Sequence, residues 1–169
     1  MNAADLRAMQ APIKERYKSA PDTALITLKA KGTLDEAHIA CKVETGRALA
    51  VAGLHPATGG SGLELCSGDM LLEALVACAG VTLKAVSTAL GIALKSGTVS
   101  AEGDLDFRGT LGVAKDVPVG FREIRLRFDL DTDASADKLD QLLKLTERYC
   151  VVYQTIRSGP PVAISLKRM

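Results

Sequence analysis

Two of the four cysteines of this chain, Cys78 and Cys150, lie in apolar helical patterns 72 positions apart. Two thiols that meet in a fold can cycle between the dithiol and the disulfide, which is a two-electron redox reaction. No other combination of residues in the sequence offers chemistry so directly. Taken alone, a buried helix cysteine is more often a small packing residue, so the positions of the two thiols in the fold decide between these interpretations.

Cys78 stands well inside its predicted helix. The positive end of a helix dipole acts only within the first turn, and Cys78 lies about nine residues from the expected start. An apolar setting alone raises a thiol pKa and makes the sulfur inert. A reactive Cys78 therefore needs a group from elsewhere in the fold that stabilises its thiolate.

The remaining cysteines and the histidines offer weaker patterns. His38 and Cys41 are separated by two residues, but no second pair of ligands follows at the spacing of a zinc site. Cys66 ends a loop, and His55 belongs to no acid or base pair visible in the sequence. We therefore expect no metal site and no cofactor.

The composition excludes several classes of protein. The 169 residues fit a single domain with an ordinary hydrophobic core. A net charge of +1, with 4% aromatic residues and no Trp, favours neither nucleic acid nor an acidic membrane. The apolar stretch around 70–92 is interrupted by charged and small polar residues, so we expect no membrane span. Without a signal-peptide pattern, the thiols are expected to be reduced in a cytoplasmic protein.

The hydrophobic periodicity predicts antiparallel strands packed on two principal helices, an α+β fold. The segment 54–68 is a glycine-rich loop without the Gly-Lys-Ser/Thr ending of a phosphate-binding loop, and Ser67 is expected to cap the helix that follows. The predicted helices are 3–18, 70–90 and one that starts at Ser135 and continues or restarts through Ile156. The predicted strands are 24–31, 38–43, 47–52, 94–107, 120–131 and 162–167, with a turn at 31–36.

Four segments resemble the OsmC/Ohr family, the osmotically induced and organic hydroperoxide resistance proteins. Residues 69–83 are similar to the central helix of that family, and residues 99–107 to the long strand that follows it. The Val-Pro-Val-Gly-Phe run that starts at Val117 resembles a family segment, and residues 142–150 resemble the helix that carries the second family cysteine. The resemblance covers roughly residues 25–168. Residues 1–21 are expected to form an added N-terminal helical arm, and residues 22–169 a single OsmC-like domain.

The resemblance implies a fold, an assembly and an activity. It implies antiparallel sheets wrapped around two long central helices in an intertwined homodimer, with two active sites at the subunit interface. Cys78 would attack a peroxide and become a sulfenic acid, and Cys150 would condense with it to a disulfide. An external dithiol or a lipoylated protein would restore the thiols, and no metal or organic cofactor is implied.

The sequence departs from the family pattern around the reactive thiol. The hydroperoxide-resistance branch holds an arginine near its cysteine with a glutamate, whereas Asp69 stands at or next to the glutamate position and no arginine occupies the early hairpin. Arg47 and Arg148 are the candidates for a substitute cation. The family Cys-Pro is replaced by Cys150-Val151. The chain thus resembles an OsmC-like subgroup.

Three functions follow from these observations. The first is a thiol peroxidase for organic hydroperoxides or hydrogen peroxide in oxidative-stress defence. The second is a non-catalytic protein that binds a small hydrophobic or thiol-bearing ligand at the dimer interface, which the missing arginine favours. The third, another cysteine-based transferase or hydrolase, lacks a histidine near either cysteine.

Overall fold

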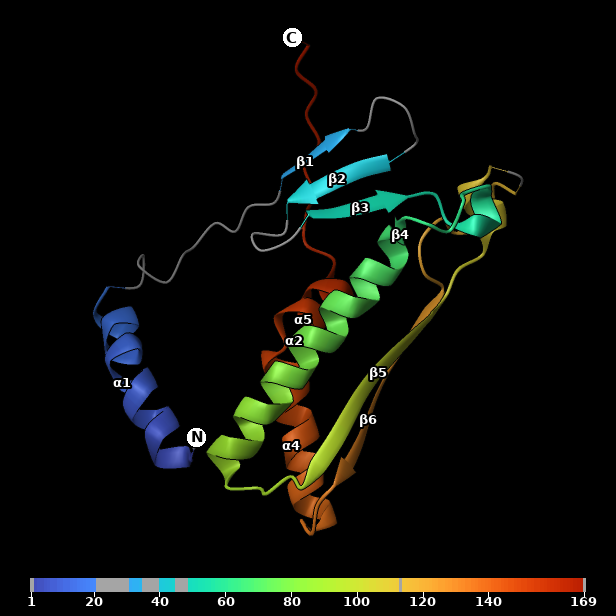
Figure 1. Cartoon of the computed structure of the whole chain (residues 1–169). Helices are drawn as coiled ribbons and strands as arrows, with labels where there is room; N and C mark the ends of the chain where they lie inside the picture. The colour runs from blue at the N-terminus through green and yellow to red at the C-terminus, as the bar shows by residue number, and fades with distance from the viewer. Residues whose placement is uncertain (1, 21–30, 35–39, 45–48, 113, 169) are drawn as a thin grey trace.

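The computed structural model describes residues 2–20, 31–34, 40–44, 49–112 and 114–168. Figure 1 shows one long helix, α2, with α4 and α5 packed along it and a long two-stranded hairpin beside these helices. The mixture of helices and small antiparallel sheets confirms the predicted α+β class. The helices are α1 (Ala3–Ser19), α2 (Ser67–Leu90), α3 (Phe107–Thr110), α4 (Ala136–Tyr149), α5 (Val151–Ser158) and the 3₁₀ turn η2 (Pro56–Thr58); the strands are β1 (Lys31–Leu34), β2 (Ala40–Glu44), β3 (Leu49–Gly53), β4 (Leu65–Cys66), β5 (Ser96–Asp104) and β6 (Glu123–Asp131).

The central helix α2 has the extent that its apolar sequence predicts. It ends at Gly91, whose φ of +67° lies in the left-handed region that favours glycine, and the Gly91 N–H reaches the carbonyl of Ser87. At its other end, Cys66 is the capping residue, with no side-chain hydrogen bond to the helix. The prediction that Ser67 is the cap was wrong, because Ser67 already has helical geometry as the first residue of α2.

The strands form two separate sheets. One has the order β1-β2-β3-β4, in which β1, β2 and β3 are antiparallel and the short β4 runs parallel to β3. The early hairpin is confirmed, but Lys31–Leu34 is a strand and not the predicted turn, because these residues pair with 41–44. Segments 24–30, 35–39 and 45–48 lie outside the described residues.

The second sheet is the hairpin of β5 and β6, which confirms the two long predicted strands. Its register runs from Ser96 opposite Asp131 to Asp104 opposite Glu123. Along β6, half-buried apolar residues alternate with exposed charged ones, as in a strand with one face on a core. On the charged face, Arg125 forms an ion pair with Asp104 across the two strands, with an N–O distance of 2.5 Å.

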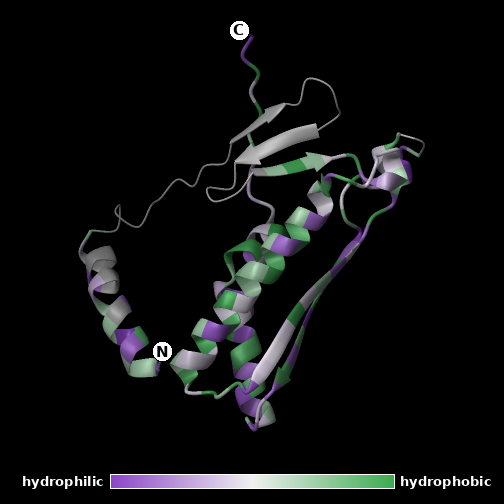
Figure 2. Ribbon diagram, viewed as in Figure 1, coloured by the Kyte–Doolittle hydropathy of each residue, from purple (hydrophilic) through white to green (hydrophobic). Residues whose placement is uncertain are grey.

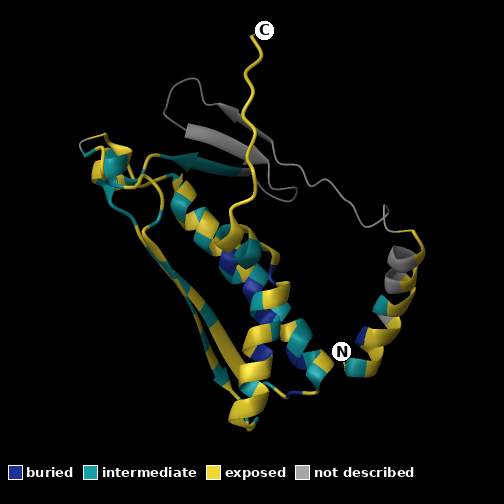
Figure 3. Cartoon of the chain, turned by 180° about the vertical axis from the view of Figure 1, so that it is seen from behind, coloured by how far each residue is buried: buried dark blue, intermediate teal, exposed yellow. Residues whose placement is uncertain are grey.

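The core lies where α2 faces α4 and the far end of the hairpin. Buried residues follow α2 at four-residue spacing, and Figure 3 shows them facing buried residues on the neighbouring helices. Leu83, Ile92 and Leu142 form the central cluster, with Phe128 of β6 packed against it. The buried residues of α2 are Leu75, Ala79, Leu83 and Ser87.

The N-terminal helix α1 continues across Pro12 and packs on the far half of α2. Leu6 is its buried contact. A cavity of about 500 Å³ remains between the two helices and extends to Thr82 and Tyr149. The helix agrees with the predicted span 3–18, while its role as a separate arm stays a prediction.

The C-terminal segment differs from its prediction as a strand. Residues 159–168 have no regular secondary structure, and Val162, Ile164 and Leu166 are 82%, 95% and 97% exposed. A strand requires a neighbouring edge for its N–H and C=O groups, and no described strand pairs with this segment. Figure 1 shows the segment running away from the helices. The alternation of apolar residues in the sequence cannot create the partner strand.

A single copy of the chain leaves much apolar surface uncovered. Figure 2 shows apolar residues along most of α2, and Leu71 and Val81 on this helix are exposed. By length and composition alone α2 could cross a membrane, but it packs against α4, α5, β5 and α1 as a core helix does. The chain exposes 12,903 Å², whereas a compact monomer of its mass exposes about 8,000 Å².

Candidate active site

Cys78 lies in the middle of α2, on the side that faces the start of α5. Its neighbours Leu75 and Ala79 are buried, and Cys78 itself is half-buried. α2 is a continuous helix around this residue, so the backbone amide of Cys78 is engaged within the helix. Only the side chain of Cys78 is available for contacts with α5.

Cys150 stands at a break between two helices. Its φ of −73° and ψ of 107° are extended, so Cys150 is at once the last capping residue of α4 and the first of α5. Its N–H donates to the carbonyl of Thr146 at 2.9 Å, and its carbonyl accepts from the N–H of Gln154 at 3.0 Å. Cys150 is 1% exposed, so this thiol faces the protein interior.

The fold brings the two cysteines together. Their side chains interact, because the Cys150 side chain lowers the pKa of Cys78 and the Cys78 side chain raises that of Cys150; both cysteines are free thiols. This contact joins residues far apart in sequence through the packing of α5 on α2. The pairing expected for Cys78 and Cys150 is therefore present in the structure as a contact between their side chains.

The sulfur of Cys78 also faces the N-terminal end of α5. Burial raises the pKa of Cys78, but hydrogen bonds from the amide N–H of Val152, the thiol of Cys150, the amide N–H of Val151 and the hydroxyl of Thr82 outweigh it. The pKa of Cys78 therefore falls below its ordinary value. The first N–H groups of a helix have no partner within the helix, and they carry its positive partial charge.

The pKa of Cys150 is shifted in the opposite direction to that of Cys78. Burial raises the pKa of Cys150, the amide N–H of Tyr153 lowers it, and the hydrogen bond to Cys78 raises it again. The result is a pKa above the ordinary value of a cysteine. The thiol of Cys78 is therefore easier to deprotonate than the thiol of Cys150.

Of the three predicted supporting residues, the structure describes Asp69 and Arg148, and neither forms a hydrogen bond or ion pair with this thiol pair. Asp69 is exposed in the first turn of α2, nine residues before Cys78. At a rise of about 1.5 Å per residue, this is about 13 Å along the helix axis. Arg148 is exposed and lies over the ring of Tyr149, with its guanidinium carbon 5.6 Å from the ring centroid. Arg47 lies outside the described residues.

The groups that the sequence did not identify are backbone amides. Among the described residues, the hydrogen bonds that lower the pKa of Cys78 come from uncharged donors. Thr82 follows Cys78 by four residues, a spacing that places both side chains on one helix face. Residue 151 can donate a backbone hydrogen bond because it is valine; the proline of the family pattern has no N–H. Both signals were present in the sequence.

An apolar cavity of about 400 Å³ is lined by neighbours of the two cysteines in sequence, but not by Cys78 or Cys150 themselves. It lies between β6 and the α4–α5 pair, and it includes Leu75, three residues before Cys78, and Tyr153, three residues after Cys150. Glu147 and Arg157 are the charged residues at its wall. The other lining residues are apolar: Ile124, Leu126, Phe128, Leu143 and Ile156.

A second group of titratable residues lies at the start of α2. Cys66 and Asp69 line a cavity of about 330 Å³ together with His55, whose ring stacks on Phe107 at a centroid distance of 4.8 Å. The Nδ1 atom of His55 accepts the N–H of Ala57 at 3.0 Å. Among the residues that the structure describes, no group of three His, Cys, Asp or Glu side chains could hold a metal ion.

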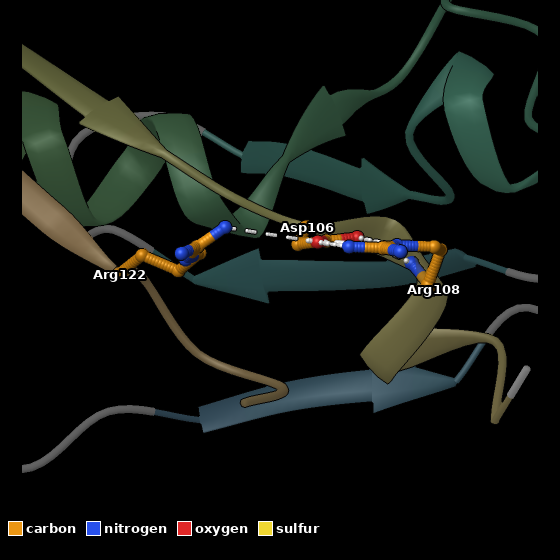
Figure 4. A network of polar contacts seen from close by, with 3 residues as sticks. All are labelled: Asp106, Arg108 and Arg122. Atoms are coloured by element: carbon orange, nitrogen blue, oxygen red, sulfur yellow. Dashed lines mark hydrogen bonds and ion pairs between the residues drawn. The ribbon is translucent and has the colours of Figure 1, made fainter. Parts of the chain in front are cut away.

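The loop between β5 and β6 closes this end of the molecule. Figure 4 shows Asp106 between two arginines, with Arg108 at 2.5 Å and Arg122 at 3.9 Å. The hydrogen bond from Arg108 is the main cause that lowers the pKa of Asp106 to about 2. The ring of Phe121, from the Val-Pro-Val-Gly-Phe run, lies against Gly103, where a Cβ atom would come within 2.5 Å of it.

The sequence matches the family model described as OsmC-like protein over residues 60–165, more than half of the chain. No curated protein matches the sequence. An OsmC-like protein from Mycoplasma pneumoniae is 16% identical with a TM-score of 0.65, and the match covers 79% of this chain and 89% of that one.

Two further crystal structures have the same fold. One is an organic hydroperoxide resistance protein OsmC from Legionella pneumophila, with 18% identity, a TM-score of 0.61 and coverage of 80% of this chain and 92% of that one. The other is an organic hydroperoxide resistance protein from Elizabethkingia anophelis, with 17% identity, a TM-score of 0.62 and coverage of 80% and 91%. At these identities the likeness shows the fold.

Proposed function

This chain belongs to the OsmC-like protein family, and on that premise we propose that it is a thiol peroxidase that reduces organic hydroperoxides or hydrogen peroxide. The observation that carries the proposal is the hydrogen-bonded pair of thiols with opposite pKa shifts, Cys78 lowered and Cys150 raised. The names of the Legionella and Elizabethkingia proteins support the same class of substrate.

The reaction proceeds in three balanced steps. The thiolate of Cys78 attacks one oxygen of the peroxide O–O bond, forms the sulfenic acid, and releases the other oxygen as an alcohol or water after it takes up a proton. The thiol of Cys150 then attacks the sulfenic sulfur, which forms the disulfide and releases water. An external dithiol, such as a lipoylated protein, reduces the disulfide by thiol–disulfide exchange and becomes a disulfide itself.

The experiment measures peroxide consumption in the presence of a dithiol. Wild-type protein is expected to consume an organic hydroperoxide and to show a Cys78–Cys150 disulfide by peptide mass spectrometry after a peroxide pulse. Cys78→Ser abolishes consumption, whereas Cys150→Ser accumulates a sulfenic acid that dimedone traps. Absence of turnover with both an organic hydroperoxide and hydrogen peroxide, together with absence of the disulfide, refutes the proposal.

We further propose that the working form is a cytoplasmic homodimer. The chain exposes 12,903 Å², about 4,900 Å² more than a compact monomer of this mass, and permanent dimers commonly bury about 1,000–2,500 Å² per subunit. The apolar residues exposed on α2 and the C-terminal segment provide such a surface. Analytical ultracentrifugation is expected to give a dimer, and a monomer at micromolar concentration contradicts this proposal.

A second candidate function is binding without catalysis. The apolar cavity of about 400 Å³ between β6 and the α4–α5 pair has the size of a small-molecule site, and no charged group of the described residues stabilises the Cys78 thiolate by a hydrogen bond. A small hydrophobic or thiol-bearing ligand retained through purification, with an unreactive Cys78, would favour this function. Rapid disulfide formation on addition of peroxide would exclude it.

A further inference from the structure

The break at Cys150 changes the partners of two backbone amides. In an unbroken helix, each N–H donates to the carbonyl four residues earlier, so Val151 would donate to Glu147 and Val152 to Arg148. In the structure, the break places these two amides at the N-terminal end of α5, which packs on α2, and they lower the pKa of Cys78 as hydrogen-bond donors. The carbonyls that they leave are among the last four of α4, which have no partner inside that helix.

Gln154 replaces one of the missing donors. Its side-chain Nε2 donates to the carbonyl of Glu147 at 2.7 Å, across the break and seven residues back along the chain. This carbonyl is the one that Val151 would bond in a continuous helix. Gln154 is half-buried, so the hydrogen bond is partly protected from competition with water.

We infer that Gln154 is a positioning residue that keeps the amides of Val151 and Val152 directed at Cys78. It does so by occupying the Glu147 carbonyl, which otherwise competes for the Val151 N–H and draws α5 back into line with α4. The Gln154 side chain forms no hydrogen bond with the side chain of Cys78 or of Cys150. The inference rests on the proposed use of Cys78 as a thiolate, but it can fail independently of peroxide turnover.

Other interactions at the break do not supply this function. The Thr146 hydroxyl donates to the Leu142 carbonyl at 2.8 Å, within α4. The Cys150 N–H donates to the Thr146 carbonyl at the end of α4. Each of these bonds would also form in a continuous helix. In the part of the chain that the structure describes, the Gln154 side chain alone bridges α4 and α5 by a side-chain hydrogen bond.

Several titratable groups lie on the elements around Cys78, and the assay must separate them from it. Cys150 is in contact with Cys78, and its raised pKa keeps it protonated when Cys78 reacts. Variants in the background Cys41→Ser with Cys66→Ser remove the other two thiols. The remaining titratable residues near the break are Glu147, Arg148, Tyr149, Tyr153 and Arg157, and α2 contributes Glu73 and Lys84.

The test is the rate of Cys78 alkylation by iodoacetamide between pH 5 and 10, with the labelled site identified by mass spectrometry. Gln154→Met keeps the volume and removes the donor. We expect the pKa of Cys78 to rise by about half a unit to one unit, which is about three- to tenfold less thiolate at a pH below the pKa. Gln154→Ala, which leaves space instead of filling it, is expected to shift the pKa in the same direction.

The matched control is Gln141→Met, the same chemical change at an exposed position of α4, which is expected to leave the pKa unchanged. A double variant makes the test more specific. Once Val151→Pro has removed the competing N–H, Gln154→Met is expected to add less than half of its single effect, because both changes act on one donor. An unchanged pKa in both folded Gln154 variants, an equal shift in the control, or full additivity overturns the inference, even where the wild type reduces peroxide.

Discussion

The most direct test of the thiolate site is Val151→Pro, which removes one N–H donor and nothing that the fold requires. Proline is well tolerated at the first position of a helix, where the N–H has no helical partner, and Val151 begins α5. The residue before a proline must be extended, and Cys150 already has a φ of −73° and a ψ of 107°. The Val151 side chain is 68% exposed, so its loss costs little packing.

The magnitude follows from the charge of the acceptor. A hydrogen bond to a charged group contributes about 1.5–3 kcal/mol, and a pKa unit corresponds to about 1.4 kcal/mol. Because three other hydrogen bonds to Cys78 remain, we expect the lower end of this range, a rise in the pKa of Cys78 of about one unit. At a pH below the pKa, the fraction of Cys78 present as thiolate is then about tenfold lower than in the wild type, and the rate of Cys78 alkylation falls by the same factor.

The assay compares Val151→Pro with Val151→Ala, which loses the same side chain but keeps the N–H. Alkylation of Cys78 against pH, together with the ultraviolet absorbance of the thiolate, gives the pKa by two methods. Circular dichroism confirms that the helices persist. Equal pKa values in the proline and alanine variants would refute the assignment of the Val151 amide as a thiolate donor.

Three further predictions concern the site and its support. Thr82→Val removes a hydroxyl that donates to Cys78 and is expected to raise the Cys78 pKa in the same alkylation assay, whereas Thr82→Ser leaves it unchanged; an equal pKa in all three proteins contradicts this role. Leu142→Ala truncates a residue that is 1% exposed and is expected to lower the free energy of unfolding by about 2–5 kcal/mol, measured by urea denaturation beside the exposed control Leu143→Ala. Asp106 has a pKa of about 2, below its unfolded value of 3.8, so its ion pairs stabilise the fold above pH 4 and this contribution is lost as the pH falls through 2. Wild type and Asp106→Asn are therefore expected to differ in stability at pH 6 and to converge at the lowest pH, and a constant difference would refute this assignment.

The sequence predicted the elements whose patterns are local. The apolar run that ends at Gly91 and the alternation along β6 are properties of contiguous residues, and both elements formed as expected. The contact between Cys78 and Cys150 was expected only through the resemblance to the family, because periodicity alone cannot place α5 against α2. The strand at 162–167 failed because a strand depends on a neighbouring edge that sequence alternation does not supply.

The sequence predicts Arg47 or Arg148 as the cation near Cys78. Arg148 is exposed and is not among the groups that shift the pKa of Cys78, while Arg47 lies outside the described residues and stays a prediction. Backbone amides have no signature in residue type, since every residue except proline carries one. The informative residue in the sequence is Val151, which carries a backbone N–H at the position where the family pattern has proline.

The single extended residue at Cys150 connects these observations. If α4 continued through it, the amides of residues 151–153 would bond the carbonyls of residues 147–149, and none would be free for a sulfur. The Cys150 thiol would also lie on an unbroken helix surface, with no helix N-terminus directed at Cys78. Because the break lies at the cysteine itself, one change of backbone direction buries the Cys150 thiol and directs two amides at its partner. The lowered pKa of Cys78 thus depends on the angle between α4 and α5, and residues that fix this angle are expected to shift that pKa without contacting Cys78.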